Sequence, residues 1–510
     1  MELTRRDLFK FGGVAAMGAA GAGMLAGCAP SSAGKNGSAE GGASSDGLPS
    51  FFQQPEAITD IAETKEFDIV VVGAGAAGVP CALAAAESGA KVALVQKESK
   101  AISQGNTCDS LVADQTDEAG RAAVVSWVTE QCAWRSHRDQ VNLWANNSGE
   151  ALKWLWDKST EAGCQIVDTT AKWTSSISTI DGQPITYFAF DYGPKPYNTG
   201  TGMQDLCDYF GGKDGLEIFY SSRAEQLVKD DSGKVIGVIC DTDNGHVQFN
   251  GSKGVVIATG DYTNDDEMMA YYNPDMANIA RKQNNKTGDG QKMMVWAGAR
   301  MEPVCGSKVQ HDFDAGPGSM ADMPFLCVKN DGTRFCNESR SAMAYMGNFL
   351  TGPQDEGYYT QVFDSNYMTD CADWPGKLYD PEALKAYMPE EEGEKTGVYE
   401  DLIATFKADT IEELGEKLGL TDVAAFAETV KLVDAGVDSD MGKEAKWLKP
   451  IKQAPFYGIH RHIRLSAIVH GVNVNEEMNV LDAEGNPIEG LYAIGTCAGN
   501  FFGSPDYPMD

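Results

Sequence analysis

A short apolar run, a glycine-rich loop and an alanine-rich segment follow one another in this chain, and together they restrict its fold more than any other feature. Phe67–Val72 predicts a buried parallel strand, and Gly73–Gly78 reads Gly-Ala-Gly-Ala-Ala-Gly. Val79–Ser88 then predicts a helix, and Lys91–Val95 a second buried strand. In such a βαβ unit the glycines let the backbone approach a pyrophosphate, and the helix N-terminus supplies N–H groups and a positive dipole end. The unit predicts a dinucleotide-binding α/β fold.

The end of the second predicted strand departs from the usual dinucleotide-binding pattern. An acidic residue normally binds a ribose hydroxyl there, whereas this strand ends in Val95-Gln96-Lys97. Gln96 can still hydrogen-bond the ribose, but without a charge. Glu98 comes two residues late, so its side chain is expected to point elsewhere. A plain nicotinamide-binding domain remains an alternative at this point.

Further along the chain, simple patterns predict more regular structure. Residues 120–162 are expected to be helical, and Val235–Cys240 with His246–Phe249 resembles a hairpin around an Asn-Gly turn. Gly254–Thr259 predicts another buried strand. Residues 380–440 are acidic and expected to be helical, with breaks at Pro and Gly.

The charge balance excludes one class of partner. The 510 residues include 74 Asp+Glu and 41 Lys+Arg, so the net charge is −33 at pH 7. Nucleic-acid binding needs a basic surface and is therefore not expected. The acidic balance instead fits a soluble surface or docking to a basic partner. Hydrophobic residues make up 42% of the chain, enough for a sizeable core. No strongly apolar run of roughly 18 residues occurs, so no conventional membrane-spanning helix is expected.

The N-terminal residues predict an export signal rather than a part of the folded domain. Arg5-Arg6 opens a twin-arginine pattern, and a weakly hydrophobic Gly/Ala stretch follows it. Leu25-Ala26-Gly27-Cys28 resembles a bacterial lipobox, which predicts acylation of Cys28; cleavage near Ala29 by an ordinary signal peptidase is the alternative. We therefore expect a signal over 1–27, a flexible linker over 28–65, and an exported, extracytoplasmic lipoprotein held at the membrane by its lipid anchor only. Twin-arginine export carries folded proteins, which favours an enzyme that is loaded with a cofactor beforehand.

Several further segments match one known family in order. They are the loop Gly73–Gly78, Gln104–Thr107, Val255–Gly260 (compare VVLATGG), Thr287–Gly290 (TGDG), Asp331–Glu338 (GxRFxNE) and Val480–Gly495. The chain thus resembles the FAD flavoproteins of the fumarate reductase group, which includes urocanate reductases and ketosteroid dehydrogenases. The resemblance implies an α/β fold: a split Rossmann-like FAD-binding domain, residues 66–305 and 455–510, with an inserted α+β substrate-capping domain, residues 306–454.

The resemblance also implies a cofactor site. FAD is expected, with its reactive edge facing a cleft between the two domains. The positions that match the family's FAD contacts, from the pyrophosphate loop through the adenosine end to the flavin, are Gly73, Gly75, Ala77, Gly78, Gln96, Ala224, Gly105, Asn106, Thr107, Asp289, Gly495 and Thr496.

The substrate-binding positions depart from the family. Fumarate reductases bind two carboxylates with arginines and histidines, since bidentate Arg matches carboxylate geometry. Here the matching positions hold Ala342, Asp506, Cys305-Gly306 and Ala467. Fumarate and other dicarboxylates are therefore not expected. A less charged substrate, such as an aromatic enoate, an enone or a steroid-like lactone, fits better.

The proton donor stays open among four residues. Arg340 and Tyr345 lie near the family's arginine position, and Tyr507 lies near the expected substrate position. His470 precedes a strand expected near the flavin. The alternatives are a packing role for Tyr507 and a structural role for His470.

The cysteines and histidines predict no redox centre besides FAD. The chain has twelve Cys but no C-x-x-C-H motif and no close cluster, so neither a covalent haem nor an iron–sulfur cluster is expected. His460 and His462 lack a third ligand nearby, so no metal site is expected. Electrons must then come from another protein, and we expect a membrane-associated c-type cytochrome.

The leading hypothesis is an exported FAD-dependent reductase that transfers hydride from flavin N5 to an activated C=C bond of a small unsaturated substrate. A ketosteroid-type dehydrogenase that runs the reverse chemistry is one alternative. The other is a non-catalytic, truncated flavin-binding lipoprotein, because the family's arginines are missing and the family pattern implies a further helix beyond Asp510.

Overall fold

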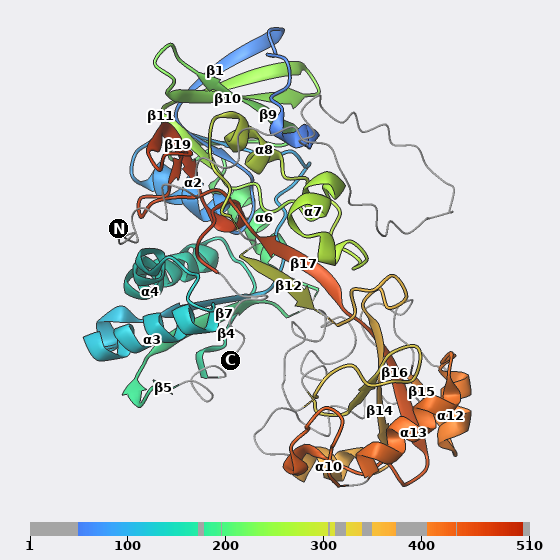
Figure 1. Ribbon diagram of the computed structural model, residues 1–510. Helices are drawn as coiled ribbons and strands as arrows, with labels where there is room; N and C mark the ends of the chain where they lie inside the picture. Colours follow the sequence, from blue (N-terminus) through green and yellow to red (C-terminus); the bar gives the residue numbers. More distant parts are fainter. Residues whose placement is uncertain are drawn as a thin grey trace, which may run out of the picture. The chain divides into compact units, whose positions relative to one another are not determined.

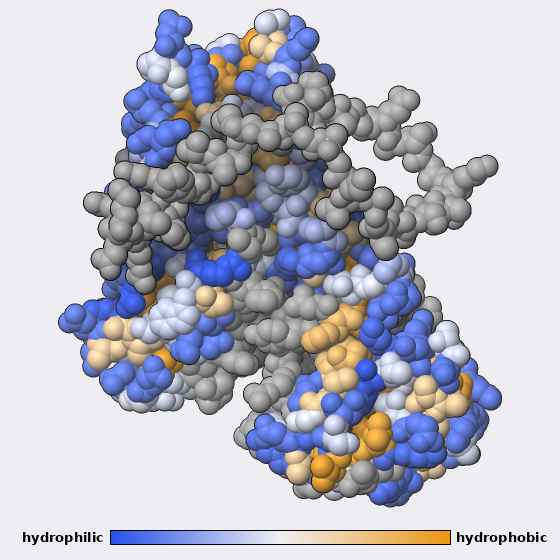
Figure 2. Space-filling view, in the orientation of Figure 1, coloured by the Kyte–Doolittle hydropathy of each residue, from blue (hydrophilic) through white to orange (hydrophobic). Residues whose placement is uncertain are grey.

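The computed structural model describes residues 49–171, 178–194, 196–303, 306–311, 323–338, 349–373, 405–434 and 436–502. The predicted acylation site Cys28 and the candidate proton donors Arg340, Tyr345 and Tyr507 lie outside these residues. Within the described ranges, no helix has the length and apolarity that crossing a membrane requires. On the face drawn in Figure 2, hydrophilic residues cover most of the described surface, in keeping with the charged composition.

A mostly parallel sheet forms the centre of the FAD-domain half of the chain (Figure 1). Its main path runs β18 (Asn479–Leu481), β19 (Pro487–Ala493), β11 (Gly245–Ile257), β1 (Ile61–Val72), β2 (Val92–Val95) and β8 (Leu216–Phe219). The pairs β19–β11, β11–β1, β1–β2 and β2–β8 are parallel. The α/β fold is confirmed, and segments from both ends of the chain share one sheet. β1 begins at Ile61, so the last residues of the expected linker belong to a strand.

The predicted hairpin is present and is longer than expected. β9 (Ser222–Lys229), β10 (Val235–Thr242) and β11 pair antiparallel, and Thr242 faces Gly245 across the turn. Gly245 has a φ of +92°, a conformation that glycine adopts without strain. The strand expected separately over Gly254–Thr259 is the second half of β11. The two predicted strands are one, because the first half of β11 pairs with β10 and its second half pairs with β19.

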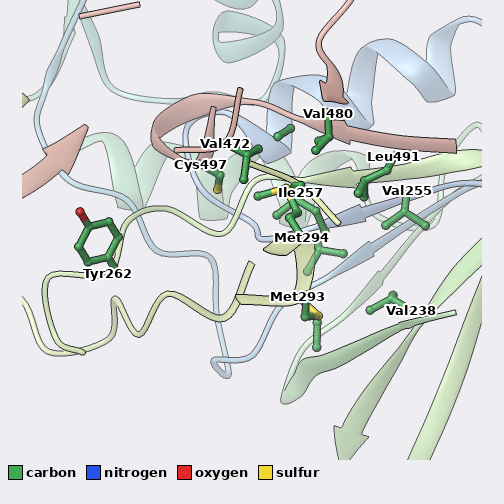
Figure 3. Packing of buried hydrophobic residues seen from close by; sticks show 14 of the residues in the cluster. Val238, Val255, Ile257, Tyr262, Met293, Met294, Val472, Val480, Leu491 and Cys497 are labelled. Atoms are coloured by element: carbon green, nitrogen blue, oxygen red, sulfur yellow. The ribbon is translucent and has the colours of Figure 1, made fainter. Parts of the chain in front are cut away.

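Alternation along β1 divides the core into two clusters. Val71 faces one side of the sheet, where it packs with Val79 and Leu83 of α2 (Gly78–Glu87). Val70 and Val72 face the other side and belong to a second cluster. Figure 3 shows that second cluster, in which residues of the sheet meet methionines of α8 (Asp289–Trp296). The labelled members there include Val255, Ile257, Leu491, Met293 and Met294.

The region predicted to be helical is a pair of helices beside a small sheet. α3 (Glu118–Gln131) begins where Asp117 accepts a hydrogen bond from Gly120 N, and α4 (Arg138–Glu161) follows. Ala133 and Trp134 separate them with positive φ angles. The remaining elements of this region are β3 (Thr107–Leu111), β4 (Ile166–Asp168), β5 (Thr179–Ile180), β6 (Gln183–Pro184), β7 (Tyr187–Tyr192) and α6 (Thr199–Phe210).

A second, antiparallel sheet lies in the expected capping region. Its order is β13 (Leu326–Val328), β14 (Tyr358–Asp364), β16 (Phe456–His462) and β15 (Thr405–Ala408). β12 (Ser307–His311) pairs separately with β17 (Arg464–Val469). The nearby helices are α10 (Tyr367–Asp373), α12 (Ile411–Lys417) and α13 (Val423–Asp434), and a short α7 (Asp266–Tyr272) belongs to the FAD-domain half. β16, which follows the predicted boundary at 454, is a central strand of this sheet.

A buried ion cluster explains the Arg-Phe-Cys-Asn-Glu motif. Arg334 donates to Glu338 at 2.6 and 3.0 Å and to Asp438 at 2.8 Å, and Lys443 lies 3.4 Å from Glu338. All four side chains are 2% exposed or less. Two cations thus face two carboxylates, which is what burial of charge requires. The motif holds the 436–443 loop to the sheet.

This cluster predicts a loss of stability in acid. Burial works to raise the pKa of Asp438, but backbone hydrogen bonds from Lys443 and Met441 and the bond from Arg334 lower it to about 2. Its stabilising effect is therefore present above the ordinary carboxyl pKa and is lost as the pH falls toward 2. With solvent screening we expect on the order of 1 kcal/mol less unfolding free energy at about pH 2.5 than at about pH 5 from this group.

Urea unfolding at both pH values measures the effect. Asp438→Asn should show a smaller drop than the parent, whereas the exposed neighbour variant Asp440→Asn should match the parent. An equal drop in the parent and in Asp438→Asn would contradict the prediction.

Candidate functional site

A cavity of about 290 Å³ lies where the parallel strands β1, β2 and β11 end. Its wall is made by residues 72–77, 95–98, 102–104, 222, 224, 258–261, 283, 285–289 and 494–496. These segments follow the carboxyl ends of neighbouring strands, where open α/β sheets bind their ligands. The cavity therefore lies at the place that the glycine-rich loop predicts.

The glycine loop is tightly packed, and it leaves a helix end facing the cavity. Gly73 has a φ of +109°, and its N–H donates to Val95 O at 2.8 Å. A Cβ on Gly73 would lie 2.4 Å from Ala258 O. α2 begins at Gly78 behind an N-cap of Ala77, whose methyl group cannot accept a hydrogen bond. Val79 N donates to Gly75 O at 3.0 Å and Pro80 has no N–H, so an anion such as a pyrophosphate would meet the Gly78 N–H and the positive end of the helix dipole.

Gln96 lines the cavity, but its amide is occupied by the backbone of its own loop. Its Oε1 accepts from Lys97 N at 2.9 Å, and its Nε2 donates to Lys100 O at 3.2 Å. Ala224 of β9 also lines the cavity. The ribose contact of Gln96 stays a prediction.

Asp289 is the centre of a charged network at the start of α8. Arg223 donates to it at 2.9 Å, Thr287 at 2.9 Å, and Lys97 lies at 3.3 Å. Burial works to raise the pKa of Asp289, but the bond from Arg223 and the charge of Lys97 lower it. The carboxylate is therefore ionised. The sequence reasoning found Asp289 and missed its two cations, although each adjoins a predicted contact residue in the chain.

A second charged group of the cavity wall was missed as well. Lys286 Nζ donates to Asp261 at 2.9 Å, to Gln104 Oε1 at 2.9 Å and to Ser466 O at 2.7 Å. The Lys286 side chain is 12% exposed and that of Asp261 is 1% exposed. The sequence held a signal for it, because Asp261 stands where the family strand VVLATGG has its last glycine.

The C-terminal end of the sheet closes the cavity beside the loop. Gly495 and Thr496 line it, and a Cβ on Gly495 would lie 3.0 Å from the Cβ of Ala77. Cys497 is buried behind them and donates to Gly260 O at 3.2 Å. Burial raises its thiol pKa to about 11, so it stays protonated.

The predicted cofactor residues divide into two groups. Those that line the cavity are Gly73, Gly75, Ala77, Gln96, Ala224, Asp289, Gly495 and Thr496. Those placed outside its lining are Gly78, Gly105, Asn106 and Thr107. Gly78 packs against the loop, since a Cβ on it would lie 1.8 Å from Gly73 O. The other three lead into β3, where Asn106 O accepts from Tyr192 N.

His470 lies outside the cavity wall and is fully buried. Its Nε2 lies 3.0 Å from Glu302 O, so that nitrogen carries the proton, and its Nδ1 accepts from Tyr262. Burial lowers the pKa of His470 to about 4, so the ring is neutral at pH 7. This geometry favours the structural alternative for His470.

Glu302, whose backbone oxygen contacts His470, also binds a residue near the end of the described chain. Its carboxylate accepts from Gly471 N at 3.1 Å and from Asn500 N at 3.0 Å. Burial raises its pKa to about 7. This carboxylate could not be predicted, because the two hydrogen bonds that it accepts come from backbone N–H groups.

Comparison with known proteins agrees with this geometry. The profile of a protein family described as "FAD binding domain" matches residues 68–504. The vinyl phenol reductase of Lactiplantibacillus plantarum is 27% identical, over 87% of this chain and 92% of its own length. The digoxin reductase of Eggerthella lenta is 26% identical, over 97% of this chain and 91% of its own length. The open conformation of a flavocytochrome c3 fumarate reductase superposes with a TM-score of 0.63 and 22% identity, covering 87% of this chain and 74% of that one.

The family match covers both halves of the parallel sheet and every segment of the cavity wall. Glycines that let the backbone approach a pyrophosphate, and a helix N-terminus that faces the cavity, are features of a dinucleotide-binding site. The chain therefore belongs to the FAD binding domain family and is an FAD-dependent oxidoreductase that acts on CH–CH or C=C groups.

Proposed function

We propose that this protein is an exported, lipid-anchored reductase that saturates the activated C=C bond of a weakly charged substrate. The observation that carries the proposal is the cavity at the carboxyl ends of the sheet, built from the glycine loop and the Asp289 network. FAD, when bound, supplies hydride at its ring N5. The chain's own residues hold and orient the cofactor.

The substrate class is inferred from charge. The positions that bind carboxylates in fumarate reductases hold Ala342, Asp506, Cys305-Gly306 and Ala467, none of which offers a cation. Ala467 lies buried in β17. A dicarboxylate would lack the bidentate partners that it needs. Relatives named for vinyl phenol and digoxin support a substrate of low charge.

The source of the proton and of the electrons completes the proposal. Arg340, Tyr345, Tyr507 and His470 remain the candidates for protonating the substrate carbon next to the activating group. The twin-arginine pattern and Cys28 support export and anchoring. A membrane-associated c-type cytochrome would deliver electrons, and the net charge of −33 suits docking to a basic partner.

Anaerobic reoxidation of the reduced protein tests this function. The purified protein is reduced with dithionite and mixed with 4-vinylphenol, a cinnamate, a steroid enone or fumarate while the visible flavin band is followed. We expect at least one of the first three to restore the band about tenfold or more faster than fumarate. Free reduced FAD with the same substrates is the control.

Other results would point elsewhere. Equal or faster reoxidation by fumarate would contradict the inferred substrate class. Bleaching of the oxidised protein by saturated ketones, without any reoxidation by the unsaturated compounds, would favour the dehydrogenase. A flavin that stays reduced, with no return of the band with any compound, would favour the non-catalytic alternative.

A further inference from the structure

Lys286 and Asp261 form a buried ion pair in the cavity wall that the fold alone does not explain. We propose that Lys286 is a cationic contact for the flavin ring, positioned by Asp261, and that the pair sets the balance between oxidised and reduced FAD. This inference rests on the FAD-dependent reductase proposed above. It assigns to two residues a role that motif matching did not give them.

The Lys286 ammonium group is fixed by acceptors from three separate parts of the chain. Gln104 follows β2, Asp261 follows β11, and Ser466 belongs to β17. Asp261 is fixed in turn, because its other oxygen accepts from Thr263 N at 2.9 Å. A lysine this deeply placed needs such partners. The cation is thus held at one point of the wall rather than free to swing into solvent.

The position of this cation differs from that of the Asp289 network. Asp289 binds Lys97 and Arg223, which adjoin the residues matched to the adenosine end. Lys286 lies only three residues earlier, but its partners belong to other segments. Gln104 matches the family's turn near the flavin, and it lines the cavity together with Lys286. That match, together with the hydrogen bond from Lys286 to Gln104, assigns Lys286 to the flavin end.

One of the three acceptors can be exchanged without breaking the pair. Gln104 is only half-buried, and its amide is neutral, whereas Asp261 is charged and almost wholly buried. An acceptor atom of a bound cofactor can take the place of the Gln104 oxygen while Asp261 keeps its bond. Reduction adds negative charge to the cofactor, so a fixed cation favours the reduced form. The charge of Asp261 offsets part of that effect.

Three variants of the purified flavoprotein test this through the reduction potential of bound FAD, measured by equilibration with redox dyes. Lys286→Met should weaken the binding of reduced relative to oxidised FAD by about tenfold or more, which is a potential about 30 mV lower for a two-electron couple. Asp261→Asn should shift the potential in the opposite direction. The double variant should lie between the two. Opposite signs are the signature of charge, since a purely structural pair would give the same sign or none.

A matched lysine–aspartate pair provides the control. Lys329 lies 2.9 Å from Asp355, which is 4% exposed, and neither residue lines the cavity. Lys329→Met should lower stability and leave the potential unchanged. If Lys286→Met does not fold, Asp261→Asn and the double variant carry the test.

Two outcomes separate this inference from the proposed function. Equal potentials in the parent, Asp261→Asn and the double variant would overturn it, even if the parent turns over a substrate. Shifts of opposite sign in a protein that reduces no substrate would uphold it while refuting the reductase. The potential is measured without substrate, so the Lys286–Asp261 inference and the proposed reductase function can be refuted independently.

Discussion

Alanine in place of Gly78 is expected to abolish stoichiometric FAD binding. A Cβ at this position would lie 1.8 Å from Gly73 O, 3.0 Å from Gly73 C and 3.2 Å from the Cβ of Ala258. The first two are backbone atoms of the loop itself, so no side chain can rotate away to make room. The start of α2 must then move off β1, and the loop loses the shape that brings its N–H groups to a pyrophosphate.

The ratio of flavin absorbance to protein after desalting measures this effect. We expect it to fall about tenfold or more in Gly78→Ala. Gly89→Ala is the matched control at the other end of the same helix. Gly89 has a φ of +88°, and its added Cβ would meet no described atom within 4 Å, so this variant should cost only about 1 kcal/mol and keep its FAD. Full FAD occupancy in Gly78→Ala would refute the close-packing argument.

Replacing Arg334 with methionine is expected to produce the largest loss of stability. The side chain is 1% exposed and bonds to both Glu338 and Asp438, so its removal leaves Lys443 as the remaining cation beside two buried carboxylates. Breaking a buried pair in this way costs about 3–5 kcal/mol. Arg334→Lys should recover only part, because an ammonium group cannot reproduce the planar fork of bonds.

Urea or thermal unfolding followed by circular dichroism measures the change. Lys431→Met is the control, because the Lys431–Glu428 pair at 2.6 Å is exposed on α13. That variant should unfold at the same urea concentration as the parent, because an exposed ion pair contributes little to stability. A similar result for Arg334→Met would mean that the cluster is hydrated and contributes little. FAD content should be unchanged in a folded Arg334 variant, since the cluster does not line the cavity.

Much of the cavity could be predicted because its signals are local. Gly73 needs a positive φ and Gly245 a tight turn, and such demands appear directly as glycine in the sequence. The apolar run of β1 and the alanine-rich α2 likewise follow from short-range patterns. The matched positions Gly73, Gly75, Ala77, Asp289, Gly495 and Thr496 line one cavity, whereas Gly78, Gly105, Asn106 and Thr107 lie outside its lining.

Other features could not be read from local patterns. β16 reads like a strand in either domain, and only its pairing with β14 and β15 places it in the capping sheet. His470 is a candidate proton donor by its chemistry and its place before a predicted strand near the flavin. Its burial, and the partners Glu302 and Tyr262 on both ring nitrogens, appear only in three dimensions.

The sequence by itself therefore determined the dinucleotide loop, the α/β class and the family. The first two depend on backbone conformations and apolar periods that neighbouring residues impose on one another, whereas the family was inferred from the ordered match of several motifs. Only the tertiary structure decided which charges meet. Lys286 reaches Asp261 and Ser466 across 25 and 180 residues of chain, and Arg223 reaches Asp289 across 66. A charge is buried only where a partner from a distant segment offsets its desolvation, and that partner is chosen by packing rather than by sequence spacing.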